Sequence, residues 1–419
     1  MTTPVAQAVS QAHRSEWAFV LAATVRLTRN LDLAEEAVQD AYERALSDWP
    51  RAGIPRNPAA WLTTVAHRRA LDLMRRESAL QRRLPLLVAD DPPGLLDPTA
   101  EGALGSLDSL DGIPDDRLRL VCTCCHPSLG VDTQVALTLR LVCGVTTAEV
   151  ARAFLVSEPT MAARITRAKK KIAVARIPYR VPALRELPDR LDAICTVIHL
   201  LFTTGHTAPI GETLLRNDLV ERSLQLARMM HVLVPGDRAV TGLLALILLT
   251  DARRDARVGA DGRLLVLADQ DRTKWDRTAI AEGTALARAA LPSTDRYTLQ
   301  AAIAAVHAEA ESWAGTDWRV ITVLYERLLR EWPSPVVRLN HAIAVGFAAG
   351  PQRGLDLLDA LGGEPALAGY GYFEASRAAF LAALDRTDEA KLAYEAALLL
   401  TENAVERRFL LDKIAALAD

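Results

Sequence analysis

Apolar residues recur every three or four positions along most of the chain, the spacing of amphipathic helices. Ala and Leu are abundant and aromatic residues make up only 5% of the chain, which favours helices over sheets. We therefore predict an all-α protein. One helix is expected over residues 10–29. Asp32, with Glu35 at capping-box spacing, predicts a second helix that buries Leu46, followed by a loop over 49–56. Asn57-Pro58 predicts the start of a third helix, which runs to about Glu77.

The segment from Thr146 to Lys171 predicts a helix-turn-helix. Thr146 and Glu149 have capping-box spacing, Phe154 to Val156 suits a turn, and Ser157 can cap a second helix. The apolar face of that second helix comprises Met161, Ile165, Ala168 and Ile172. Its other faces carry polar and basic side chains suited to the DNA major groove: Thr160, Arg164, Arg167, Lys170 and Lys171. An amphipathic hairpin with a solvated basic face is the alternative that this segment leaves open.

The net charge of −3 conceals a segregation of charge. Arginines cluster in residues 67–83, and bases without any acid fill residues 164–180. The stretch between them, 84–116, carries acids but no Lys or Arg, together with several Pro and Gly residues. This pattern indicates two nucleic-acid-facing modules joined by an anionic linker.

The C-terminal half predicts further helices, from Pro188 to the end of the chain. A weak repeat appears there, because Ile321, Tyr325 and Leu328 recur at the same spacing as Ala390, Tyr394 and Ala397, and Leu355 falls between them. This spacing is typical of the second helix of tetratricopeptide-type repeats, in which neighbouring helices interlock. A plain helical bundle is the alternative.

Three cysteines and a histidine form the cluster Cys122, Cys124, Cys125 and His126. Zinc binding, redox sensing and core packing are all compatible with these residue types. We favour core packing because the spacing is not the usual C-x-x-C and the cluster falls on a predicted helix. His199 and His206, on and after an apolar helix, are likewise interpreted as packed side chains. With no phosphate-binding glycine loop and no convincing catalytic set, we predict a protein that is not an enzyme and needs no metal or cofactor.

The chain carries no apolar run of the roughly 18 residues that a membrane span requires. The run from Thr241 to Thr250 is too short and is interpreted as a buried helix. The N-terminal residues do not resemble a secretory signal, and five cysteines do not suggest a disulfide framework. We therefore expect a cytoplasmic protein without a membrane partner.

With these motifs in place, the chain resembles bacterial RNA polymerase sigma factors of the extracytoplasmic-function class. DLAEEAVQDAYERAL resembles their polymerase-binding helix, PAAWLTTVAHRRALDLMRRE the helix that meets the −10 promoter element, and TTAEVARAFLVSEPTMAARITRAKKKI the helix-turn-helix that reads the −35 element. The later phrases RLRLVCTCCHPSL, DRLDAICTVIHLLFTTGH, LLALILLTDARRDARV, LQAAIAAVHAEA and SPVVRLNHAIAV resemble a subgroup with a long helical C-terminal extension.

The resemblance implies two small helical sigma domains, 10–83 and 114–180, joined by the acidic linker 84–113, with a helical-repeat extension over 188–419. Its implied partners are core RNA polymerase and promoter DNA, and the extension is expected to regulate or support activity and to bind a protein or peptide. The residues implied to bind core polymerase are Asp32, Glu35, Glu36, Gln39 and Asp40. Those implied at the −10 element are Trp61, Arg68, Arg69, Asp72, Arg75 and Arg76. Those implied at the −35 element are Thr160, Arg164, Arg167, Lys170 and Lys171.

Some of these roles have structural alternatives. The acidic face is also compatible with plain solvation, and Trp61 with a place in the core. The linker could occupy the RNA path of polymerase or simply lack structure. A helix-turn-helix repressor with a ligand-binding helical domain is the alternative function, and a repeat scaffold that binds only proteins is a third. The two basic modules with an acidic tether favour the sigma factor.

Overall fold

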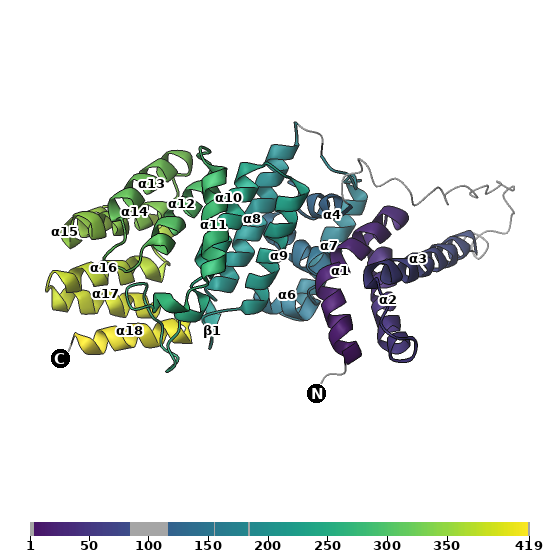
Figure 1. Cartoon of the computed structure of the whole chain (residues 1–419), viewed down its shortest axis with the longest axis horizontal. Helices are drawn as coiled ribbons and strands as arrows, with labels where there is room; N and C mark the ends of the chain where they lie inside the picture. The colour runs from purple at the N-terminus through teal and green to yellow at the C-terminus, as the bar shows by residue number, and fades with distance from the viewer. Residues whose placement is uncertain (1–3, 84–115, 155, 183–184, 418–419) are drawn as a thin grey trace. The chain divides into compact units, whose positions relative to one another are not determined.

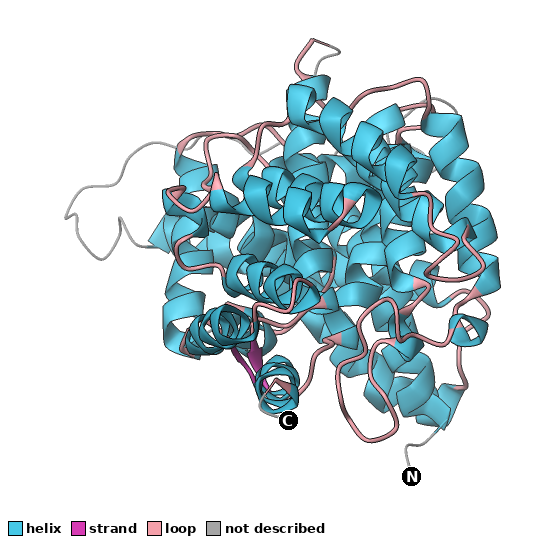
Figure 2. Cartoon of the chain, turned by 90° about the vertical axis from the view of Figure 1, so that its left-hand side faces the viewer, coloured by secondary structure: helices cyan, strands magenta, loops and turns pink. Residues whose placement is uncertain are grey.

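The computed structural model describes residues 4–83, 116–154, 156–182 and 185–417. Helices dominate, as Figure 2 shows, so the all-α prediction is confirmed. The chain divides into two compact units, Met1–Val197 and Ile198–Asp419, and the division falls inside helix α8. The expected acidic linker, 84–113, lies outside the described residues.

The first unit is built entirely from helices in its described part (Figure 1). In chain order these are α1 (Pro4–Thr28), α2 (Leu31–Ala52), α3 (Pro58–Arg83), α4 (Asp116–Cys124), α5 (Val131–Leu137), the π-helix η2 (Thr138–Val142), α6 (Thr147–Ala153), α7 (Glu158–Val174) and the first part of α8 (Leu187–His206).

Helix starts largely follow the predicted capping signals. Asn57 accepts a hydrogen bond from the Ala60 N–H at 3.0 Å at the start of α3. The prediction for α2 was wrong in one respect, because Asn30 rather than Asp32 caps it and accepts from the N–H groups of Asp32 and Leu33.

Helix α2 also differs from its prediction at the C-terminal end. The helix continues through Pro50 to Ala52 where a loop was expected, and Gly53, at φ 83°, ends it. Leu46, expected on the buried side, is exposed, because Trp49 takes the buried position at the end of that face.

The second unit begins within α8 and contains a long series of helices. They are α9 (Asn217–Leu233), α10 (Arg238–Asp251), α11 (Arg277–Ala290), α12 (Arg296–Glu309), α13 (Trp318–Glu331), α14 (Pro335–Ala349), α15 (Pro351–Asp359), α16 (Gly371–Ala383), α17 (Thr387–Leu399) and α18 (Ala404–Ala416), with the 3₁₀ turns η3 (Arg254–Ala256), η4 (Arg272–Lys274) and η5 (Pro365–Leu367).

Helix α10 is the buried helix predicted for 241–250 and packs against α9, α11 and α12. Gly242 lets α12 approach, since a Cβ there would lie 2.7 Å from the Thr298 backbone nitrogen. Gly283 does the same for the Leu249 side chain. In the described part of the chain, none of the helices combines the length and apolar character that crossing a membrane demands.

Helices α13 to α18 pack mainly on their neighbours in the chain, and each residue of the predicted weak repeat lies at least partly inside their core. Ile321 and Leu328 belong to one cluster, and Leu355, Ala390 and Tyr394 to the next. The Phe380 ring lies against Gly346 and Gly354, where added Cβ atoms would approach it to 2.7 Å or less. This arrangement of successive helices is the stacking that the sequence spacing suggested.

The end of the chain returns to the start of the second unit. Strand β1 (Ile210–Gly211) pairs in parallel with β2 (Glu402–Asn403), the magenta pair in Figure 2. The buried Asn403 side chain donates 2.9 Å hydrogen bonds to the carbonyls of Ala208 and Thr213 and caps α18. Because this amide is fully paired, it fixes the C-terminal helix against the 208–213 segment.

Candidate functional site

The predicted helix-turn-helix is formed by α6 and α7. Thr146 and Glu149 exchange the hydrogen bonds of a capping box, and the Ser157 hydroxyl accepts from the Thr160 N–H. The four residues of the predicted apolar face are buried, as expected: Met161, Ile165, Ala168 and Ile172.

The predicted −35 side chains lie on the remaining surface of α7. Thr160, Arg167 and Lys170 are exposed, while Arg164 is half-buried with its guanidinium 5.6 Å from the centre of the Phe154 ring. Lys171 is exposed and donates to the Ser128 carbonyl. A band of hydrogen-bond donors therefore faces outward from a helix whose opposite side is fixed in the core.

Helix α3 carries the predicted −10 residues. Arg68, Asp72, Arg75 and Arg76 are exposed, and Arg75 lies 3.9 Å from Asp72. Trp61 is half-buried and packs edge-on against Trp49, with ring centres 5.6 Å apart. Its ring contributes to the core.

Arg69 differs from the other α3 arginines because it is held within the fold. Its guanidinium pairs with Asp40 and lies 3.7 Å from Glu36, both on α2. The structure therefore joins one residue of the predicted −10 set to two of the predicted polymerase-binding set.

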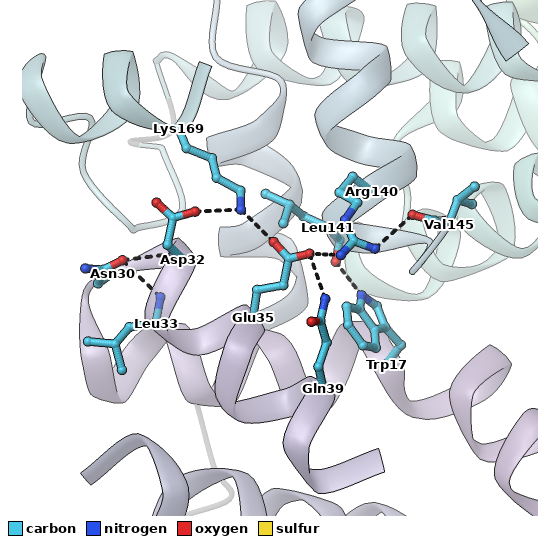
Figure 3. A network of polar contacts seen from close by, with 10 residues as sticks. All are labelled: Trp17, Asn30, Asp32, Leu33, Glu35, Gln39, Arg140, Leu141, Val145 and Lys169. Atoms are coloured by element: carbon cyan, nitrogen blue, oxygen red, sulfur yellow. Dashed lines mark hydrogen bonds and ion pairs between the residues drawn. The ribbon is translucent and has the colours of Figure 1, made fainter. Parts of the chain in front are cut away.

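The acidic face of α2 is centred on Glu35, whose side chain is only 8% exposed. Its carboxylate pairs with Lys169 of α7 at 2.6 Å and with Arg140 of η2, and it accepts from the Gln39 amide at 3.3 Å (Figure 3). Lys169 also reaches Asp32 at 2.7 Å. Glu36 and Gln39 remain exposed on the outer side of the helix.

Two cations around one buried carboxylate form a strong local network. Burial by itself would lower the pKa of Lys169, but the charges of Glu35 and Asp32 outweigh it and raise that pKa above its usual value. Arg140 is anchored further by a 3.1 Å hydrogen bond to the Val145 carbonyl. The network links the predicted polymerase-binding helix to the helix-turn-helix.

A second contact between these parts lies beside the first. The Trp17 indole N–H of α1 donates to the Leu141 carbonyl at 2.9 Å (Figure 3). Gly144, at φ 66°, presses against the same ring, and a Cβ there would lie 2.8 Å from it. Only glycine tolerates both this φ and this proximity without strain.

A third set of contacts between these two parts of the first unit involves Tyr179 and Asp116. The Tyr179 hydroxyl lies within hydrogen-bonding distance of the carbonyls of Ala22 and Asp116, and Arg26 pairs with Asp116 at 3.3 Å. The described helices of the two expected sigma domains share one compact unit, and these polar contacts lie between them.

Lys169 and Arg140 were missed in the sequence analysis. Lys169 was grouped with the basic cluster, although it follows Ile165 by one helical turn and so lies beside the buried stripe. Helical phase could have separated it from Lys170. Nothing local to the sequence identifies Arg140 as the second partner of Glu35.

The cysteine cluster lies in the core of the same unit. Cys122, Cys124 and Cys125 are buried, and burial raises the pKa of Cys122 to about 12 and that of Cys125 to about 11. The thiols are therefore held protonated, which suits packing and disfavours reactivity. Within the described ranges, we find no group of three His, Cys, Asp or Glu side chains placed to hold a metal.

Comparison with known proteins matches both modules to family models. Residues 14–80 match sigma-70 region 2, and residues 123–172 match sigma-70 region 4. The ECF RNA polymerase sigma factor SigK of Mycobacterium sp. (strain KMS) is 32% identical over 146 residues, which cover 33% of this chain and 68% of that protein. The chain belongs to the ECF family of RNA polymerase sigma factors.

The rest of this sigma factor also has relatives. Residues 190–291 match a family of unknown function, DUF6596. An uncharacterised protein of Rhizobium meliloti (strain 1021) is 42% identical over 403 residues, covering 94% of this chain and 93% of that one. No solved structure matches the chain. The long C-terminal extension is therefore shared with a relative of nearly the same length.

We predict that Glu35 and Lys169 are energetically coupled in this sigma factor. In a double-mutant cycle with Glu35→Gln and Lys169→Met, each single change should lower the free energy of unfolding of the first unit, and the coupling should be about 1–3 kcal/mol. Chemical denaturation followed by circular dichroism measures it. Lys170→Met, one residue along and exposed, is the matched control and should change little. Additive effects of the two changes would contradict the prediction.

Proposed function

We propose that this sigma factor contacts core RNA polymerase through the outer face of α2 and promoter DNA through α3 and α7. We further propose that its C-terminal unit regulates or supports transcription in the cytoplasm. The observation that carries the assignment of α7 is its division into a buried stripe and an exposed band of Thr160, Arg167 and Lys170 beside a capped N-terminus. A helix fixed on one side and rich in donors on the other suits the major groove.

The proposed roles on α3 follow from charge and exposure. Arg68, Arg75 and Arg76 face solvent, where guanidinium groups can meet phosphates of the −10 region. Asp72 lies beside Arg75 and would orient it. Trp61 packs on Trp49 of α2 and so joins the first turn of α3 to the end of α2.

In the free chain, several of the α2 residues proposed to bind polymerase already have partners inside the first unit. Glu36 and Gln39 are exposed, although Glu36 also lies 3.7 Å from Arg69 and Gln39 donates to Glu35. The carboxylates of Asp32, Glu35 and Asp40 are engaged by Lys169, Arg140 and Arg69. A polymerase surface that uses Glu35 therefore has to displace α7 from α2. The proposed order is contact at Glu36 and Gln39 first, followed by release of the buried carboxylate.

The exchange is feasible because basic groups on polymerase can replace the two cations that Glu35 loses. Without such a replacement, a carboxylate deprived of its partners would remain in a poorly solvated position. The same displacement would free α7 to move towards its promoter element. Core binding and promoter reading are thereby coupled in the proposal.

Arg164→Ala and Arg167→Ala should each weaken promoter binding by the holoenzyme by about 1–3 kcal/mol, the usual contribution of a good base contact. Run-off transcription with purified core polymerase and a binding assay on the cognate promoter measure the effect. Arg185→Ala is a control, because Arg185 is 86% exposed and lies outside α7. Unchanged transcription in both variants would refute the roles of these arginines.

Glu36→Lys should lower the affinity for core polymerase at least about 10-fold, because it places a like charge against a basic surface. Glu36 is 57% exposed, so the change leaves the buried network at Glu35 in place. Asp48→Lys, an exposed position later on the same helix, is the matched control. Co-purification with core polymerase and a titration give the readout. Equal binding by Glu36→Lys and the parent chain would show that this face is merely solvated.

Removal of the C-terminal unit should reduce transcription. A chain ending at Val197, the last residue of the first unit, is compared with the full chain, both in cells and with purified polymerase, and circular dichroism checks that the shorter chain is helical. The support for a required role is that the 42% identity to the R. meliloti protein runs over the extension. Equal activity of the two chains in both settings would leave the extension without a regulatory role.

A further inference from the structure

The second unit contains an open cavity of about 840 Å³, in which none of the residues proposed above to bind polymerase or DNA lies. It forms where the end of α8, the end of α10, the start of α16 and the segment 400–410 meet. The β1–β2 pair and Asn403 hold the last of these segments in place. Its polar lining includes His199, His206, Arg253, Arg257, Tyr372 and Glu406.

A smaller cavity of about 260 Å³ adjoins the first. Both are lined by Leu246, Thr250, Arg253 and Gln300, so Arg253 stands where they meet. The smaller cavity is otherwise mostly apolar and aromatic, with Trp275 and Tyr325 in its wall. The larger volume by itself falls in the range of small-molecule sites.

Arg253 has no hydrogen bond or ion pair from its side chain to any described residue. The arginines around it each have at least one hydrogen-bond or ion-pair partner, although Arg272 Nη2 is buried without one. Arg254 pairs with Asp251 at 2.5 Å, and Arg272 donates to the carbonyls of His307 and Ala310 at 2.7 Å. Arg257 donates to the His206 carbonyl and to the Thr207 hydroxyl. The guanidinium of Arg253 is thus left without an anion.

The groups around Arg253 do not supply the missing negative charge. Burial and the nearby charge of Arg257 lower the pKa of Arg253 to about 10, still far above neutrality, so the group stays charged. Glu406 does not neutralise it, because Glu406 accepts from the Tyr372 hydroxyl and acts on Arg257. Arg253 is half-buried. A cation in such a position without a partner is less stable than a paired one, and an anion in the cavity would supply the missing partner.

Two histidines add hydrogen-bonding capacity. His206 Nε2 in the first cavity and His307 Nδ1 in the second are buried without a partner among the described residues. Burial, together with Arg257 and Arg253 near His206, lowers the pKa of His206, and burial with Arg253 and Arg272 lowers that of His307 to about 4. Both rings are therefore neutral at pH 7. The other nitrogen of His206 donates to the Thr250 backbone, so its Nε2 can only accept a hydrogen bond, whereas His307 can offer a donor or an acceptor to a ligand.

We propose that these joined cavities bind a small organic anion, with its carboxylate or phosphate group paired to Arg253 and its apolar part in the smaller cavity beside Trp275. The Arg253 fork suits two oxygens of either group. His206 lines the larger cavity and His307 the smaller one. The second unit of this sigma factor would thereby sense a metabolite.

The test is calorimetric and thermal titration of the full chain with three probes: inorganic phosphate, succinate and glucose 6-phosphate. Sodium chloride at equal ionic strength is the blank. At least one probe should raise Tm and give a measurable Kd. A response to glucose 6-phosphate or phosphate assigns a phosphate ligand, and a response to succinate alone assigns a carboxylate. The absence of any response in the parent chain overturns the proposal.

Two variants tie the response to Arg253. Arg253→Met should weaken binding of the active probe at least about 10-fold, the loss expected for a charge-assisted bidentate contact. Arg319→Met, exposed on α13, is the matched control and should bind as the parent chain does. Unaltered binding by Arg253→Met overturns the proposal.

The Tm of Arg253→Met without any probe distinguishes a ligand-binding role of Arg253 from a structural one. Since Arg253 has no partner in the described fold, Arg253→Met should unfold at the same or a higher Tm than the parent chain in chloride alone. A lower Tm for Arg253→Met would show that the side chain supports the fold and would count against the ligand site. Arg253→Lys keeps the charge without the fork and should retain part of the affinity.

Discussion

The buried carboxylate of Glu35 is the constraint on which the first unit depends. A charge with an exposed fraction of 8% requires partners, and it finds them in Lys169 and Arg140, more than a hundred residues away. Trp17 and Tyr179 add hydrogen bonds to backbone carbonyls on either side. The region 2 and region 4 modules are therefore joined through polar groups that cannot be left unpaired.

The ion pairs of Glu35 join the two helices that are proposed to bind polymerase and the promoter. The helix that resembles the polymerase-binding element and the helix that resembles the promoter reader share their charges in the free chain. Ion pairs of this kind are specific but exchangeable, because another basic surface can satisfy the same carboxylate. In the function proposed above, the Glu35 network is the physical link through which polymerase binding releases the promoter-reading helix.

The second unit is organised by a different constraint. Glycines at 242, 283, 346 and 354 allow close helix contacts, and a single asparagine, Asn403, ties the last helix to the first segment of the unit. An open cavity lies beside this closure, and an arginine without a counter-charge lines it. Elsewhere in the unit, arginines such as Arg228 and Arg377 have carboxylate partners, so the unpaired state of Arg253 stands out as a feature of the cavity.

The sequence by itself determined the helices, the capped helix-turn-helix, the buried stripe of α7 and the family, because caps and apolar periodicity are local signals that survive without tertiary information. The sequence analysis placed the cap of α2 at Asp32 instead of Asn30 and ended that helix too early, because Asn and Asp are equally good caps. It placed Glu35 on the solvent-facing side of the helix, because the distant partners of this carboxylate cannot be recognised from the residues near it. Only the tertiary structure decided that Lys169 faces inward while Lys170 faces solvent, and that Arg253 lacks an anion. Both are outcomes of contacts between distant segments, where burial rather than residue type sets the role of a charge.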